Sequence, residues 1–468
     1  MIEFRGRWLT ILAIVGLLVL WELLYYQGLI DSLRFSHPFA ILQILGDSAF
    51  LQGLGVLLAQ VGLTSLLGGL VGLALGSLII RSAWLTQTSI RVLRFGLWVP
   101  FLVLWVDPIF STFQQRNSAA GIAQVVTAIV FLLIPAVALS TCYDYLTVRF
   151  LLARDWRDTR SYVLRDSTLQ ALLISLLAQM SLSPYRWDWF EVTGPRGVAV
   201  AYAALIVLIV LLFLLDKVFR ASFDSAAEVR GAIITTEVAS RSWSSLWGSV
   251  LIGLGCLVLG LIAYFYPLIS SPLDVLQAIY RLFVGTSISS TNETIWRHLG
   301  ISIFEAFGGL LLAGGVALIV RRALFAGATF RNWAFPFLSL TYIAPIVLSV
   351  VLIVWAQPYG VYPWRIAVGV ALLSFFPFMQ VLWGLRERPL SFQILLAADE
   401  ALPFAFVAML FGEAFTSVVG LGFFMVVARA KLYIAESVAA SLLTLALLIG
   451  LSSALRAVVK WRYFPART

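Results

Sequence analysis

The sequence predicts an all-α polytopic membrane protein with about 12 transmembrane helices, arranged as two parallel six-helix repeats. Of the 468 residues, 61% are hydrophobic and 12% are charged, whereas about 25% of the residues in a soluble domain carry charge. Many apolar runs exceed the roughly 18 residues that suggest a spanning helix. A third observation is an internal repeat, because the segment His37–Ile44 returns half a chain later as Ser271–Ala278.

Twelve apolar runs define the predicted spans. They cover about 8–29, 53–80, 92–110, 120–141, 167–183 and 198–215, and then 247–268, 298–320, 333–356, 362–385, 403–426 and 436–456. The first run lacks a small-x-small cleavage site and more spans follow, so we read it as a retained helix rather than a signal sequence. The domains are a first repeat at 1–215, a cytoplasmic linker at 216–245 and a second repeat at 246–468.

The distribution of Lys and Arg tests this topology. With the N-terminus inside, 23 of the 32 Lys and Arg residues fall in cytoplasmic segments and the other nine fall outside. This bias follows the positive-inside rule and predicts a multi-pass protein of a bacterial or archaeal plasma membrane (the cell inner membrane) with both termini in the cytoplasm. The net charge of +9 is therefore interpreted as attraction of the loops to anionic lipid, not to nucleic acid.

Chemical motifs are absent from the sequence. Cys142 and Cys256 lie far apart, and there are two His residues, so neither a disulfide framework nor a His-based metal site is predicted. The chain contains no Gly-x4-Gly-Lys-Ser/Thr nucleotide loop, no nucleophile elbow and no His-Glu-x-x-His helix. We therefore predict that the chain is not an enzyme and binds no cofactor itself.

Polar residues and prolines inside the spans are the candidates for a transport path. Burying a charge in a bilayer is costly, and a proline inside a membrane helix frees a backbone carbonyl. Each type of residue also has a structural interpretation. The prolines could form ordinary helix kinks, and Glu413 could form a structural hydrogen bond near Gly420–Gly422. The candidate residues are Ser65, Pro100, Ser302, Glu305, Pro345 and Glu413.

In the second predicted span of each repeat, a serine is followed seven residues later by a glycine on about the same helix face. The two pairs are Ser65 with Gly72 and Ser302 with Gly309. Small residues let helices approach closely in lipid, so these glycines are predicted to pack against neighbouring helices.

The most specific pattern lies near the C-terminus, where a helix-borne Glu413 precedes Gly420-Leu421-Gly422-Phe423. Together with Trp21-Glu22 at the end of the first helix, it resembles the permeases of binding-protein-dependent ABC importers of the nitrate, sulfonate, taurine and bicarbonate branch. The chain looks like a duplicated permease of this family with both copies fused. The resemblance implies a small anionic solute, ATP bound on separate cytoplasmic ATPase subunits, and an extracytoplasmic solute-binding protein.

In that family, cytoplasmic loops with a Glu-Ala-Ala pattern and a following glycine couple the permease to the ATPase. This sequence departs from the pattern, because neither candidate loop has the glycine and the second is followed at once by the fifth span. The candidate coupling residues are Ala153, Arg154, Asp155 and Trp156 in the first half and Ala397, Ala398, Asp399 and Glu400 in the second.

Two alternatives stay open. A secondary transporter could also have twelve spans in two parallel halves, although the loop Arg81–Thr86 lacks the Gly-x3-Asp-Arg type of motif. A non-transporting membrane scaffold derived from a permease would explain the degenerate coupling loops. Co-purification of an ATPase subunit would distinguish all three.

Overall fold

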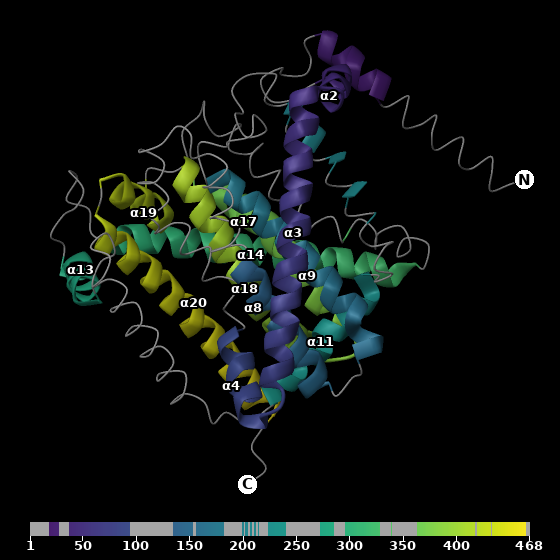
Figure 1. Ribbon diagram of the computed structural model, residues 1–468. Coiled ribbons are helices and arrows are strands. Elements are labelled where there is room, and N and C mark those ends of the chain that lie inside the picture. Colours follow the sequence, from purple (N-terminus) through teal and green to yellow (C-terminus); the bar gives the residue numbers. More distant parts are fainter. Residues whose placement is uncertain are drawn as a thin grey trace, which may run out of the picture.

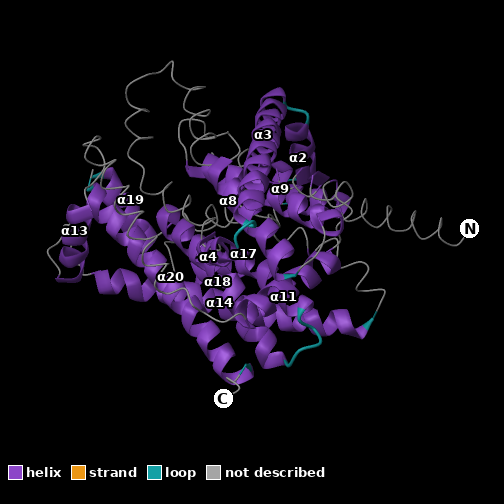
Figure 2. Ribbon diagram, turned by 60° about the horizontal axis from the view of Figure 1, so that its bottom comes forward, coloured by secondary structure: helices purple, strands orange, loops and turns teal. Residues whose placement is uncertain are grey.

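The computed structural model describes most of the helical core. The described residues are 18–27, 37–93, 134–152, 156–181, parts of 199–214, 223–239, 272–284, 295–327, 338, 363–416, 419–431 and 433–464. All regular elements within these segments are helices, and Figure 2 draws no strand among them. The prediction of an all-α fold is thus confirmed for this part of the chain.

The N-terminal part is built around one long helix, α3 (Ser48–Ile79). It runs from α2 at one end to α4 at the other (Figure 1). The other described elements here are α2 (Pro38–Leu45), α4 (Ala83–Leu93), α8 (Ile134–Leu146), the π-helical turn η2 (Thr147–Leu151) and α9 (Trp156–Ser181). Helix α3 packs against both α8 and α9.

Capping residues set the start of α2 and α3. Pro38 occupies the first turn of α2, where its missing N–H costs nothing, and His37 precedes it as the N-cap. The Asp47 carboxylate accepts a hydrogen bond of 3.0 Å from the Ala49 N–H at the start of α3. Glu22 lies 3.0 Å from His37 Nδ1 and accepts the Phe39 N–H, so it ties the first helix to α2.

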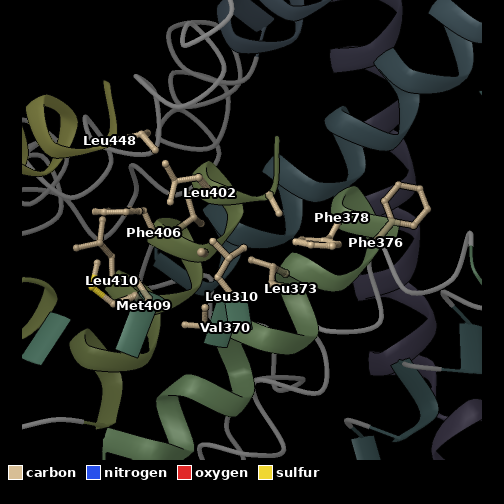
Figure 3. Packing of buried hydrophobic residues seen from close by; sticks show 14 of the residues in the cluster. Leu310, Val370, Leu373, Phe376, Phe378, Leu402, Phe406, Met409, Leu410 and Leu448 are labelled. Atoms are coloured by element: carbon tan, nitrogen blue, oxygen red, sulfur yellow. The ribbon is translucent and has the colours of Figure 1, made fainter. Parts of the chain in front are cut away.

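The C-terminal part contains α13 (Pro272–Val284), α14 (Ile295–Ala326), α17 (Pro363–Gly384), α18 (Leu390–Thr416), α19 (Leu421–Ala430) and α20 (Ile434–Tyr463). Helix α14 packs against α17 and α18, which also pack against each other. Figure 3 shows Leu310 of α14, Val370 of α17 and Met409 of α18 meeting in the buried core. This three-helix packing fixes the positions of the polar residues that α14 and α18 carry.

Five of the described helices are long and apolar enough to cross a membrane: Ser48–Ile79, Ile295–Phe325, Ile366–Gly384, Leu390–Leu410 and Ala435–Tyr463. In the C-terminal half of helix α3, the glycines at 68, 69, 72 and 76 are buried and most leucines are exposed, which is the reverse of the pattern in a soluble helix. An added Cβ at Gly72 would lie 2.5 Å from the Ala138 carbonyl oxygen, while Leu66 and Leu70 are about 60% exposed, at 61% and 59%. Close backbone contact inside and leucine outside is the pattern expected of a helix in lipid.

Several helices begin or end at other residues than the predicted spans. The fifth span of the second half was predicted at 403–426, but α18 begins earlier, at Leu390, continues through Pro403 and ends at Thr416. Helix α9 also begins before the predicted 167–183. The predicted spans at 92–110, 247–268 and 333–356 lie almost entirely outside the described residues.

The linker at 216–245 contains a packed helix, α11 (Phe223–Ala239), that its polar composition did not suggest. Ala226, Ala227 and Ile233 are almost fully buried, and α11 contacts η2, α17 and α20. Its backbone meets α17 where Gly231 faces Gly384, and a Cβ on Gly384 would overlap the Ala227 carbonyl group. Two facing glycines therefore allow α11 to cross α17 at close range.

Candidate functional site

The candidate site lies at the break between α18 and α19. Helix α18 ends at Thr416 and α19 starts at Leu421, with Gly420 between them at a φ of +116°. Only glycine adopts this conformation readily, and an added Cβ would also overlap the Glu413 carboxyl group. The glycine predicted to interrupt this span therefore does so, and it also makes room for the glutamate.

Three side chains hold the backbone N–H groups at the start of α19. The Gly420 N–H donates to His298 Nδ1 at 2.9 Å, and the Leu421 N–H donates to Ser302 Oγ at 2.9 Å. The Gly422 N–H donates to Glu413 Oε2 at 2.7 Å. The first N–H groups of a helix have no partner within the helix, so these contacts satisfy donors that would be costly to bury unpaired.

The Ser302 hydroxyl links α14 to α18, because it donates to Glu413 Oε1 while accepting from Leu421. Glu413 and Ser302 are both buried, with exposures of 0% and 1%. Both residues were predicted from the sequence as candidates for the transport path, and in the structure they are in direct contact. Each oxygen of Glu413 receives a hydrogen bond, which is how a buried carboxylate is stabilised.

Glu305 lies one turn beyond Ser302 on α14 and is also buried, with 1% exposure. Neither of its carboxyl oxygens accepts a hydrogen bond from the described residues. Ser302 and Glu305 lie on the same face of α14, and Ser302 on this face binds Glu413. The site therefore contains one fully hydrogen-bonded carboxyl group and one that lacks donors.

The corresponding serine in the N-terminal part has a neutral partner. Ser65 Oγ of α3 lies 3.0 Å from Thr168 Oγ1 of α9, and Thr141 Oγ1 of α8 donates to Ser167 Oγ at 2.9 Å. These hydroxyl pairs connect the three packed helices there. Polar contacts thus join neighbouring helices in both parts, and the serine of the C-terminal part binds a carboxyl group where the serine of the N-terminal part binds a hydroxyl group.

A second polar cluster centres on Arg230 of α11. Its guanidinium group pairs with Glu400 of α18 and lies 3.6 Å from Asp144 of α8. The Asp144 side chain is 1% exposed and the Glu400 side chain 10%. Arg230 therefore connects a helix of the N-terminal part to a helix of the C-terminal part.

The predicted coupling residues of the second half lie inside α18 rather than on a separate surface helix. Ala397 and Asp399 are fully buried. Asp399 receives hydrogen bonds from Ser452 Oγ at 2.5 Å and Arg456 Nε at 2.8 Å, both from α20. The adjacent acids Asp399 and Glu400 are the sequence signal for this arrangement, because acids inside an apolar helix require basic partners.

Several predicted site residues are not placed. Pro100, Pro345, Ala153, Arg154 and Asp155 lie outside the described residues, and Trp156 begins α9. Four polar residues of these clusters were not predicted as site residues. His298 accepts the Gly420 N–H, Asp144 lies near Arg230, and Arg230 and Arg456 pair with the acids of α18. These residues become recognisable only when the helices that carry them are packed together.

These features define a protein that is all-helical within the described residues, with helices long and apolar enough to cross a membrane and with two buried polar clusters. Comparisons of the chain with protein-family models, with curated proteins and with solved structures find no match.

Proposed function

We propose that the chain is the transmembrane permease subunit of an ABC-type importer, with both permease halves fused in one polypeptide. The observation that carries this proposal is that one serine in each half forms a hydrogen bond to a neighbouring helix. Ser65 of α3 bonds to α9, and Ser302 of α14 bonds to α18. Each serine lies on a 32-residue helix. Helix α3 also packs against α8, which precedes α9, and α14 also packs against α17, which precedes α18.

The glycines support the same correspondence. Gly72 follows Ser65 and packs against α8, while Gly309 follows Ser302 and packs against α17. The short helices before α3 and α14 both begin at a proline, Pro38 and Pro272. Matching residues with matching neighbours are expected of two copies of one unit, and parallel repeats of this kind build transporters around a central axis.

The proposed cargo is a small solute, an anion by the family resemblance, that moves between the halves near their pseudo-two-fold axis. Energy would come from cytoplasmic ATPase subunits, because the chain has no nucleotide-binding loop. Of the path candidates, Ser302 and Glu413 bind each other and the start of α19, so we assign them a structural role. Ser65 is partly buried and remains a candidate for lining the path.

A membrane scaffold derived from a permease is the second candidate, and the burial of Asp399 and Glu400 favours it. Both acids of the second coupling segment are engaged by basic residues of the chain itself, Arg456 and Arg230. An ATPase could not bind these carboxylates without displacing those partners.

The test is purification of the full-length chain from its own membranes in mild detergent, with an unrelated polytopic protein of the same membrane as the control. We expect an ATPase subunit to co-purify in stoichiometric amounts, and ATP to drive solute uptake once the complex is reconstituted in liposomes. Absence of the ATPase with uptake driven by a proton or sodium gradient would establish a secondary transporter instead. Absence of both, with another protein bound stably, would establish a scaffold.

A further inference from the structure

We propose that Glu305 binds a proton within the membrane and shares it with Glu413, so that the two glutamates form a carboxylic acid–carboxylate pair. This proton site goes beyond the proposed permease function and does not depend on it. The pair joins α14 to α18 beside the α18–α19 break.

Glu305 lies at a depth in the membrane where an ionised carboxylate without a partner is unfavourable. An α-helix rises about 1.5 Å per residue, so Glu305 lies about 15 Å from the start of α14, which is about 48 Å long. The hydrocarbon core of a bilayer is about 30 Å thick, so a helix of this length that spans it carries Glu305 inside the apolar region. An ionised side chain there requires a partner.

Hydrogen bonding distinguishes the two carboxyl groups. Glu413 accepts from the Ser302 hydroxyl and from the Gly422 N–H, one donor for each oxygen. These donors stabilise the ionised form of Glu413. Glu305 has no such donor among the described residues, so nothing in this part of the chain stabilises its ionised form.

The neighbouring groups leave Glu413 as the partner of Glu305. Ser302 precedes Glu305 by one turn on the same face of α14 and donates to Glu413, so α14 presents Glu305 toward the Glu413 carboxyl group. Among the described residues, no group of three or more His, Cys, Asp and Glu side chains could hold a metal ion. His298 is occupied by the Gly420 N–H, and the other acids of α18, Asp399 and Glu400, are paired with Arg456 and Arg230.

Two ionised carboxylates that face each other in an apolar site repel strongly, whereas one shared proton removes the repulsion. With the proton on Glu305, its O–H donates to Glu413, and Glu413 remains an anion with three donors. No other atom needs to move. The start of α19 is therefore held by a carboxylate whose charge is balanced by hydrogen bonds rather than by a cation.

Infrared spectroscopy tests the proposal directly, because a protonated carboxylic acid has a carbonyl stretch that a carboxylate lacks and that shifts in D2O. The full-length chain in lipid nanodiscs at neutral pH would be compared with Glu305→Gln, Glu413→Gln and Glu387→Gln. Glu387 is exposed and serves as the matched control. We expect Glu305→Gln to lose one carbonyl band that the other two variants retain.

Two outcomes would overturn the proposal. If the band survives in Glu305→Gln, or disappears in Glu413→Gln alone, the proton does not reside on Glu305. If no band depends on Glu305, and the melting temperature rises with sodium or potassium over choline in the parent chain but not in Glu305→Gln, the site holds an ionised carboxylate and a cation. We expect the melting temperature to be the same in all three salts.

Folding of the variant is checked separately. A glutamine at 305 keeps an N–H donor toward Glu413, so Glu305→Gln is expected to melt within a few degrees of the parent chain. Glu305→Leu removes the donor and is expected to melt lower than Glu305→Gln. An equal melting temperature for Leu and Gln would contradict a hydrogen bond from residue 305 to Glu413.

Discussion

Glu413 shows how a charged residue is accommodated in an otherwise apolar helix. Its oxygens bind the Ser302 hydroxyl and the Gly422 N–H, so the helix break supplies one of the donors that the carboxylate needs. The break in turn exists because Gly420 has a positive φ. The glycine and the glutamate therefore depend on each other.

At this scale we predict that Gly420→Ala destabilises the protein. A non-glycine residue in this backbone region costs about 1–3 kcal/mol, and the added Cβ would also displace the Glu413 carboxyl group. Thermal unfolding in detergent, followed by circular dichroism, measures the effect. Gly450→Ala in α20 is the control, because no atom lies within 4 Å of its added Cβ. Equal melting temperatures for the two variants would contradict the structural role of Gly420.

At the scale of elements, α11 is the helix that joins the two parts of the chain. Its small residues approach α17 at Gly384, and its Arg230 contacts α8 and α18 at once. A second ion pair, between Arg386 and Glu228 at 2.7 Å, is more exposed. Exposed pairs contribute little, so Arg230 is expected to dominate the electrostatic part of this contact.

We predict that Arg230→Gln destabilises the protein by about 3–5 kcal/mol, because it removes the cation that pairs with buried Glu400 and lies beside buried Asp144. Arg388→Gln is the matched control, since Arg388 is exposed, and should change stability by no more than about 0.5 kcal/mol. Adding Glu400→Gln to Arg230→Gln should recover part of the loss in chemical denaturation. Recovery in the double variant is the result that distinguishes lost charge pairing from general damage to α11.

At the scale of the whole molecule, α3 and α14 expose many large aliphatic side chains and bury several of their glycines. The exposed aliphatic residues of α3 include Leu51, Val56, Leu63, Leu66, Leu70 and Leu78. Helix α14 shows the same pattern, with Leu311 and Ile319 more than 70% exposed, at 76% and 71%. Such surfaces would be unstable in water but suit a bilayer.

The charge bias predicts that both termini face the cytoplasm. Epitope tags at the two ends should be inaccessible to antibody in intact cells and accessible after permeabilisation. A tag on the loop near Arg297, which is predicted to lie outside, is the positive control in intact cells. Labelling of one terminus alone without permeabilisation would require an odd number of spans and would exclude the twelve-span topology, whereas labelling of both would contradict the predicted orientation.

The sequence predicted the helices whose signal is local. The apolar runs at 53–80, 298–320, 362–385 and 436–456 correspond to α3, α14, α17 and α20, with ends that differ by at most seven residues. The break at Gly420 was also predicted, because Gly-Leu-Gly interrupts an apolar run. By contrast, α11 was missed, since its stability comes from packing on α17 and not from an apolar run of its own.

The sequence alone predicted helices long and apolar enough to cross a membrane, and it marked Ser302, Glu305 and Glu413 as unusual polar residues within the predicted spans. Composition and hydrophobic run length are sufficient for the first conclusion, because a bilayer accepts so few kinds of structure. The tertiary structure decided which partner each polar residue has: Glu413 binds Ser302 and Gly422, Arg230 binds Glu400, and Glu305 faces a second carboxyl group. Those partners are more than 100 residues apart in several cases, and only the packing of helices brings them within hydrogen-bonding distance.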